Sequence, residues 1–373
     1  MCKVKLLDCT LRDGGYLNDW RFGEDDIKYT IEHLVKAKMD IVEIGFLRDE
    51  EYISGRAVFR DIMKASEYLD LYNNKNRPLF SLMVEQFNPY PTKKLPYRDK
   101  TNIDAIRIII WKRLIPEAVE YAKKFRDKGY QVCIQPERVN QYTIDEFKSM
   151  IETVSLIDPM GIYIVDSNGF LCKNDLLTYL KAAHDVMNPS ISLGYHGHNN
   201  LLETVGTAES LVELGLDRKI IIDGSILGMG RSSGNLPIEL FAKYMNDNWN
   251  GEYGILDLVE IYDRCIEKHY RNKPWGYSMQ TFVTSALKAN PNYAEILKSD
   301  YGLMSGEIYR TVEVMDNQDK VITNRNKLKD YIKDVGVGMA KSCIGEIAQK
   351  QNSLQNNKQK LLDTFLGGGG EIE

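Results

Sequence analysis

The sequence of 373 residues lacks the features that mark membrane, secreted and nucleic-acid-binding proteins. No apolar run approaches the roughly 20 residues that a helix needs to cross a bilayer, so we expect no membrane segment. The N-terminal residues enter a strand-like segment without a secretory signal pattern, so we expect a cytoplasmic protein. A net charge of −5 gives no electrostatic reason to expect a nucleic-acid partner.

Cysteine is sparse, and its spacing matches no common metal or redox motif. None of the six cysteines stands in a Cys-x-x-Cys pair, so zinc-finger and redox-motif interpretations have no support. We expect buried or free thiols in a reducing compartment instead. The positions are Cys2, Cys9, Cys133, Cys172, Cys265 and Cys343.

The first 250 residues contain short β-branched runs that alternate eight times with segments of helical periodicity. Several runs are apolar nearly throughout, which is typical of parallel strands buried on both faces. The expected strands are 4–8, 40–46, 79–84, 103–110, 130–135, 161–166, 192–196 and 219–226. The expected helices include 26–38, 55–71, 116–128, 144–157, 174–187, 201–214 and 236–247.

Eight strand–helix units in about 250 residues favour a closed (β/α)8 TIM barrel. An open doubly wound sheet is the competitor, but its Gly-x-Gly-x-x-Gly turn is missing after the first strand, where the sequence reads RDGGY. We expect residues 1–250 to form the catalytic barrel and 251–348 a mostly helical C-terminal extension. Within it, residues 251 to about 312 are expected to form a cap or dimerisation element. Residues 349–373 are rich in Gln, Asn and Gly and are expected to form a flexible tail.

The strand ends carry a pattern typical of a metal site. Active sites of barrel enzymes lie at the C-terminal ends of the strands. His196 and His198 are two residues apart, so in an extended strand both imidazoles point the same way. With a nearby carboxylate, which an aspartate at the end of the first strand could supply, they suit Mn²⁺, Co²⁺, Zn²⁺ or Fe²⁺, and Mg²⁺ less well. A chance or structural His-x-His pair is the alternative; the position at a strand end favours the metal.

Four motifs occur in an order that resembles the DRE-TIM metallolyase superfamily, the barrels related to HMG-CoA lyase. They are LLDCTLRDG at 6–14, VEI at 42–44, GYHGHNNL at 194–201 and GMGRSSGN at 228–235. The superfamily holds 4-hydroxy-2-oxovalerate aldolase, 3-hydroxy-3-methylglutaryl-CoA lyase, and the isopropylmalate and homocitrate synthases. The pattern at 228–239 is most similar to the 4-hydroxy-2-oxovalerate aldolases. The acyl-CoA lyases carry a cysteine in the strand-8 loop, and this sequence has none between 172 and 265.

The resemblance implies a role for each matching residue. Asp13, His196 and His198 would bind the metal, with Asn235 at or near its coordination shell. We expect Mn²⁺, with Mg²⁺, Co²⁺ or Zn²⁺ as alternatives. The ion would act as a Lewis acid on the enolate of a 2-oxo acid.

The same motifs imply the substrate contacts. Arg12 would lie over the 2-oxo acid and add positive charge where the oxyanion grows, while Glu43 would brace it. A buried structural ion pair is the alternative for these two residues. Arg48 is expected either to meet an anionic group of the second substrate or to be a plain surface arginine. Asp166 and Ser167, at the end of the sixth strand, are expected to contact substrate.

Two loops near the strand ends are also candidates. The glycine-rich loop at 228–234 leads into a helix expected near Asn235, so it either holds a carboxylate or phosphate or is a tight connection. The insert at 85–102 follows the third strand and is expected to wall one side of the site.

One position departs from the aldolase pattern. The aldolase branch has an acid/base histidine three residues after the metal aspartate, and here that residue is Tyr16. The three other histidines, His33, His184 and His269, fall in expected helices, with His33 on the solvent side of its helix. Tyr16, a metal-bound water or Asp166 would then move the proton, or the acceptor differs from short aldehydes. Tyrosine is a poor base unless Arg12 and the metal lower its pKa.

The favoured function is a divalent-metal-dependent aldolase acting through a pyruvate-type enolate on a small 2-oxo acid and an aldehyde. A Claisen-type synthase that joins an acyl-CoA to a 2-oxo acid is one alternative, and a non-catalytic metal-binding scaffold is another. We expect a homo-oligomer. The region after 250 does not match the aldolase family's helical domain that docks an aldehyde dehydrogenase, so that partner is not carried over.

Overall fold

The computed structural model describes residues 4–72, 76–321 and 323–336. The chain divides into two compact units, residues 1–285 and 286–373. The expected tail at 349–373 lies outside the described residues, and the division into domains at 250 and 348 stays a prediction.

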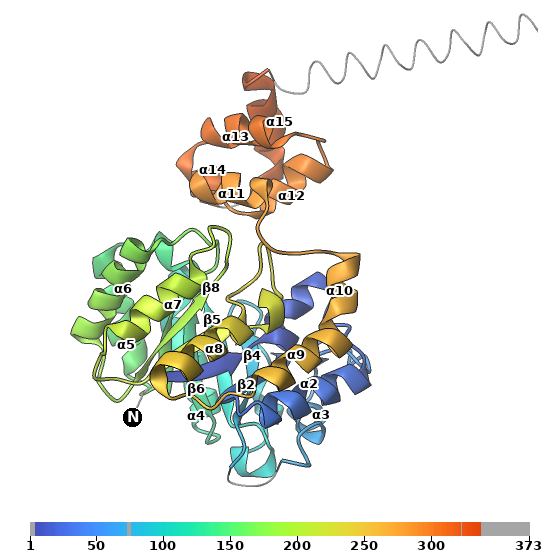
Figure 1. Cartoon of the computed structure of the whole chain (residues 1–373). Coiled ribbons are helices and arrows are strands. Elements are labelled where there is room, and N and C mark those ends of the chain that lie inside the picture. The colour runs from blue at the N-terminus through green and yellow to red at the C-terminus, as the bar shows by residue number, and fades with distance from the viewer. Residues whose placement is uncertain (1–3, 73–75, 322, 337–373) are drawn as a thin grey trace, which may run out of the picture. The chain divides into compact units, whose positions relative to one another are not determined.

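Eight parallel strands close into a barrel in the first unit (Figure 1). The strand order is β1-β9-β8-β7-β6-β5-β4-β2, and pairing of β1 with β2 closes the ring. The strands are β1 (Val4–Asp8), β2 (Ile41–Leu47), β4 (Leu79–Glu85), β5 (Ala105–Ile110), β6 (Gln131–Pro136), β7 (Gly161–Asp166), β8 (Ser192–Gly197) and β9 (Ile220–Gly224). The predicted TIM barrel is confirmed.

Amphipathic helices follow the strands and cover the barrel (Figure 1). They bury apolar stripes such as Phe147, Met150, Ile151 and Val154 of α5. The helices are α2 (Glu24–Lys36), α3 (Ile62–Glu67), α4 (Ile115–Arg126), α5 (Ile144–Ser155), α6 (Lys173–Val186), α7 (Thr204–Glu213) and α8 (Ile238–Trp249).

The predicted helix at 55–71 is wrong in its first half. Val58–Phe59 forms a short strand, β3, that pairs with Phe46 and Leu47 of β2. Asp61 then caps α3 by accepting a hydrogen bond from the Met63 amide (2.9 Å). A β-branched and an aromatic residue beside a free strand edge gain more from pairing with that strand than from continuing the helix.

Helices also follow the barrel, as predicted. In the first unit they are α9 (Ile255–Ile261), a π-turn (Tyr262–Ile266) and α10 (Glu267–Asn272). Leu258, Ile261, Cys265 and Ile266 are buried along these helices, whereas Val259 is 43% exposed. α11 (Met279–Ala286) spans the boundary between the units, and the second unit contains α12 (Asn292–Ser299), α13 (Ser305–Glu313), α14 (Asn317–Val321) and α15 (Arg325–Asp334). None of the described helices has both the length and the apolarity that a membrane span requires.

Candidate active site at the C-terminal ends of the strands

A sharp turn after the first strand brings Arg12 and Asp13 to the mouth of the barrel. Asp8, the last residue of β1, accepts hydrogen bonds from the Thr10 amide (2.9 Å) and hydroxyl (2.8 Å). The short helix α1 (Thr10–Asp13) therefore starts directly after the strand. Arg12 and Asp13 are both buried there, and both line a cavity of about 270 Å³.

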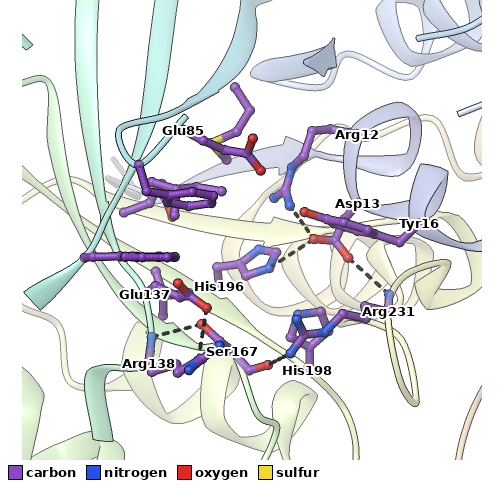
Figure 2. A pocket seen from close by; sticks show the side chains of 16 residues that line it. Arg12, Asp13, Tyr16, Glu85, Glu137, Arg138, Ser167, His196, His198 and Arg231 are labelled. Carbon is purple, nitrogen blue, oxygen red and sulfur yellow. Dashed lines mark hydrogen bonds and ion pairs between the residues drawn. The ribbon is translucent and has the colours of Figure 1, made fainter. Parts of the chain in front are cut away.

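Asp13, His196 and His198 come together at one side of this cavity (Figure 2). Each offers a ligand atom, and these atoms lie within 4.8 Å of one another. The two imidazoles come from the end of β8, with ring centres 5.4 Å apart. The structure thus brings together the three residues that we predicted as metal ligands.

The surroundings of these three residues fit a divalent cation. His198 Nδ1 and Asn235 Oδ1 are buried and have no hydrogen-bond partner among the described residues. Asn235 pairs with His198 through its backbone, and its Nδ2 donates to the Met229 carbonyl (3.1 Å). Burial lowers the pKa of His198 to about 3, so its imidazole is neutral and able to bind a metal. Burial raises the pKa of Asp13, but Arg12 and the imidazoles outweigh it and keep the carboxylate ionised.

A closed network of buried charges lies behind Asp13, His196 and His198. Arg12 Nε donates to Glu43 Oε2 (2.7 Å), and Arg107 Nη1 donates to the same oxygen (2.8 Å). Arg107 also pairs with Asp223, whose Oδ2 is 3.0 Å from His196 Nδ1. Arg12 pairs with Asp13, which completes the ring.

The charge balance of this network favours a cation. Two guanidinium groups face three carboxylates, of Asp13, Glu43 and Asp223, so one negative charge is left over apart from the imidazoles. An uncompensated charge at such depth is costly, and a bound divalent ion would offset it. Asp223 also fixes the His196 ring so that Nε2 faces Asp13 (3.6 Å). Metal-binding histidines commonly have such a carboxylate partner.

Arg107 and Asp223 are two residues of this network that were not predicted from the sequence. Arg107 interrupts an otherwise apolar strand, and its side chain is fully buried in the barrel. A lone arginine in such a run was the available signal, because a charge is rarely buried without a partner. Asp223, at the end of an Ile-Ile-Ile run, was the matching carboxylate.

The glycine-rich loop is a tight connection that holds Asp13. The Arg231 amide donates to Asp13 Oδ1 (3.3 Å). A Cβ at Gly230 would lie 2.8 Å from the same oxygen and 2.5 Å from Asn235 Nδ2, so only glycine allows this approach. The helix that follows begins at Ile238 rather than near Asn235.

Tyr16 lines the cavity beside Asp13, with its hydroxyl pointing inward (Figure 2). Gly15 allows the turn, because a Cβ there would overlap the Trp20 ring. The Tyr16 ring packs edge-on against Trp20, with ring centres 4.9 Å apart. Tyr16 is 39% exposed, but desolvation of its hydroxyl in the cavity and the charge of Asp13 raise its pKa, so the hydroxyl is protonated at neutral pH.

The other predicted substrate contacts differ in their placement. Ser167 lines the cavity, and its carbonyl accepts a hydrogen bond from Arg231 Nη2 (3.0 Å). Arg48 does not line it, but forms a two-pronged pair with Glu85, which does (3.1 and 2.8 Å). Asp166 does not line it either: its oxygens accept from the backbone amides of Gly169 (3.0 Å) and Leu171 (2.8 Å).

His33 is buried, which corrects the expectation that it faces solvent. Its Nδ1 lies 3.0 Å from Asp257 Oδ1 and 3.2 Å from Glu260 Oε2, both on α9. The imidazole therefore ties α2 to the first helix after the barrel, a contact that the helical period of α2 alone does not reveal.

Comparisons with known proteins find related sequences. A model of the HMGL-like family matches residues 96–263. Oxaloacetate decarboxylase of Mycobacterium tuberculosis is 24% identical over 295 residues, covering 75% of this chain and 80% of that protein. The 4-hydroxy-2-oxovalerate aldolase of Pseudoalteromonas translucida is 24% identical over 276 residues, covering 70% and 74%. That of Leptothrix cholodnii is 33% identical over 213 residues, covering 53% and 56%.

Solved structures share the fold. The N-terminal domain of an aldolase-like protein from Bacteroides vulgatus superposes with a TM-score of 0.68 at 22% identity, covering 80% of this chain and 98% of that one. The HMG-CoA lyase of Brucella melitensis gives a TM-score of 0.56 at 14% identity, covering 72% and 99%.

Proposed function

We propose that this chain, which belongs to the DRE-TIM metallolyase superfamily and is a metal-dependent lyase, is an aldolase that acts through a pyruvate-type enolate. The observation that carries the proposal is the buried network, in which Arg12 lies between Glu43 and the metal-binding aspartate Asp13. The network offers a divalent ion a site with one excess negative charge. The same network holds a guanidinium fixed at the edge of the cavity.

Arg12 is the residue that we assign to the 2-oxo acid. Its Nε is engaged by Glu43 and its Nη1 by Asp13, and its Nη2 has no hydrogen bond to any described residue. This free N–H group can donate to an oxygen of the substrate. A donor already fixed in place stabilises a developing oxyanion without the cost of reorganisation.

Asp13, His196 and His198 would hold the metal, with Asn235 Oδ1 close by. A divalent ion bound there would polarise the 2-oxo carbonyl as a Lewis acid. We propose Mn²⁺, because two imidazoles with a carboxylate suit it better than Mg²⁺.

Tyr16 would act as a proton donor. A hydroxyl with a raised pKa stays protonated at neutral pH and can donate to the oxygen of the aldehyde as the carbon–carbon bond forms, or take that proton back during cleavage. Deprotonation of the pyruvate methyl group would need a stronger base than this tyrosine.

Decarboxylation of a 2-oxo dicarboxylate is a second candidate. It also produces a pyruvate enolate, but loss of CO₂ requires no base. The presence of Tyr16 in place of a histidine, and similarity to oxaloacetate decarboxylase over 80% of that protein, both favour it.

Pyruvate release tests the proposal. The metal-loaded enzyme should release pyruvate from 4-hydroxy-2-oxo acids in an assay coupled to lactate dehydrogenase, and a chelator should abolish the reaction. Pyruvate release only from oxaloacetate, with CO₂, would favour the decarboxylase. Loss of the thioester on mixing acetyl-CoA with 2-oxo acids would instead indicate a Claisen-type synthase.

A further inference from the structure

The cavity has a second wall, formed by the opposite half of the barrel from the metal ligands. Glu85 is the last residue of β4, and it is in register with Ile109 and Gln135, the next-to-last residues of the neighbouring strands β5 and β6. Glu137 and Arg138 follow directly after β6. Figure 2 shows Glu85, Glu137 and Arg138 across the cavity from the group around Asp13.

We call this second wall, formed by Glu85, Ile109, Gln135, Glu137 and Arg138, the acceptor wall. Its charged side chains are balanced in pairs. Glu85 is held by Arg48 through two hydrogen bonds, and Glu137 Oε1 lies 3.0 Å from Arg138 Nε. Paired charges of this kind favour neither a second anion nor a cation. They still offer fixed carboxylate acceptors and N–H donors, and hydroxyl groups can use both.

Arg138 is held in an unfavourable backbone conformation at this wall. Its φ of +54° and ψ of 62° place it in the left-handed region, which a non-glycine residue rarely adopts. Its amide donates to Ser167 Oγ (3.0 Å), which fixes the turn. Strain of this kind collects at functional sites, where it aims a side chain.

An aromatic surface completes the acceptor wall. The rings of Phe87 and Trp111 stack with centres 4.3 Å apart and planes at 17°. Arg113 also lies over Trp111, so Phe87, which is 37% exposed, is the ring with open area. A ring face beside polar donors and acceptors matches a molecule with C–H groups on one face and hydroxyls at its edge.

We infer that the second substrate is a neutral, polyhydroxylated, sugar-like aldehyde. This inference rests on the proposed aldolase function. In the condensation, a base other than Tyr16 takes a proton from C3 of pyruvate, and the electron pair left on C3 forms the bond to the aldehyde carbon. The aldehyde C=O π bond breaks, and its oxygen takes up a proton. The acceptor wall holds the hydroxyl groups beyond that carbon.

The test compares aldehydes of equal chain length with Mn²⁺-loaded enzyme and pyruvate. Glyceraldehyde is paired with propanal, and erythrose with butanal. We expect kcat/KM to be at least tenfold higher for the hydroxylated member of each pair. Hydroxyl groups activate an aldehyde by themselves, so the deciding quantity is the change of this ratio in variants.

Glu137→Gln and Phe87→Ala should each lower the ratio at least fivefold. Both aldehydes are measured on the same preparation, so any loss of folded enzyme cancels in the ratio. Glu67→Gln, an exposed carboxylate on α3, and Tyr97→Ala, an exposed ring outside the cavity, are the matched controls and should leave the ratio unchanged.

Two outcomes overturn the inference in different ways. A ratio below about three, or a high ratio that neither wall variant lowers, rejects the sugar-like acceptor. If deuterium from D₂O enters the pyruvate methyl group in the same preparation, the enolate function survives that rejection. If no deuterium enters and no aldehyde reacts, the proposed function and this inference fall together.

Discussion

Arg107 is the residue on which the buried network depends most, so its removal should strongly destabilise the barrel. In Arg107→Met, Glu43 and Asp223 lose their shared partner, and the network's excess negative charge grows from one to two. Removing one partner of a buried pair typically costs about 3–5 kcal/mol. We expect a loss of that size in the free energy of unfolding without metal.

A double variant separates charge from packing. Arg107→Met combined with Glu43→Gln returns the network to one excess negative charge, so it should recover part of the stability that the single variant loses. The difference between the double variant and the two single variants measures the coupling. Arg77→Met is the control: Arg77 pairs with Asp104, which keeps Arg98 as a second partner, so we expect a smaller loss.

Urea unfolding followed by tryptophan fluorescence measures these effects. All four tryptophans lie within the first unit, so the signal reports on the barrel and the helices packed on it. Two results would refute the account of the network. One is a loss in the free energy of unfolding below about 1 kcal/mol for Arg107→Met. The other is a loss in the double variant that equals or exceeds the sum of the losses in the two single variants.

Four further predictions concern the site itself. The His196→Ala/His198→Ala variant should bind no metal ion by elemental analysis, and full occupancy would reject these ligands. Arg12→Lys should keep the fold by circular dichroism but lose about 10²–10³ in rate, since lysine lacks the planar fork; activity within threefold of wild type would make Arg12 structural. Tyr16→Phe should slow aldol chemistry by about 10²–10⁴ at unchanged metal affinity if Tyr16 transfers the proton, whereas weaker pyruvate binding alone would indicate packing. In chelator-treated protein, unfolding titrations should show stability falling as the pH drops from about 6.5 towards 3, because the unfolded chain takes up a proton that folded His198 excludes; an equal slope in His198→Gln would contradict this.

The barrel could be predicted from sequence because its signal is local and repeated. In apolar strands such as Ala105–Ile110 and amphipathic helices such as Ile144–Ser155, the residue pattern of the segment itself predicts its secondary structure. The short strand at Val58–Phe59 could not be predicted in this way, because it forms only through pairing with β2, which is a tertiary contact.

The metal side of the site was predictable for a similar reason. Asp13, His196 and His198 stand at strand ends, and closure of a barrel brings those ends together. The acceptor wall was not. Arg138 and Phe87 lie in loops, and loop geometry depends on contacts such as that of Arg138 with Ser167, which no sequence period encodes.

Deuterium exchange tests the central claim of enolate formation most directly, because it needs no acceptor. The protein is incubated with pyruvate and Mn²⁺ in D₂O, and methyl deuteration is followed by mass spectrometry. We predict deuteration that requires both protein and metal, and that falls to the protein-free rate in Asp13→Asn. Deuteration no faster than with Mn²⁺ and pyruvate alone, in protein that elemental analysis shows to be loaded with metal, would contradict the claim.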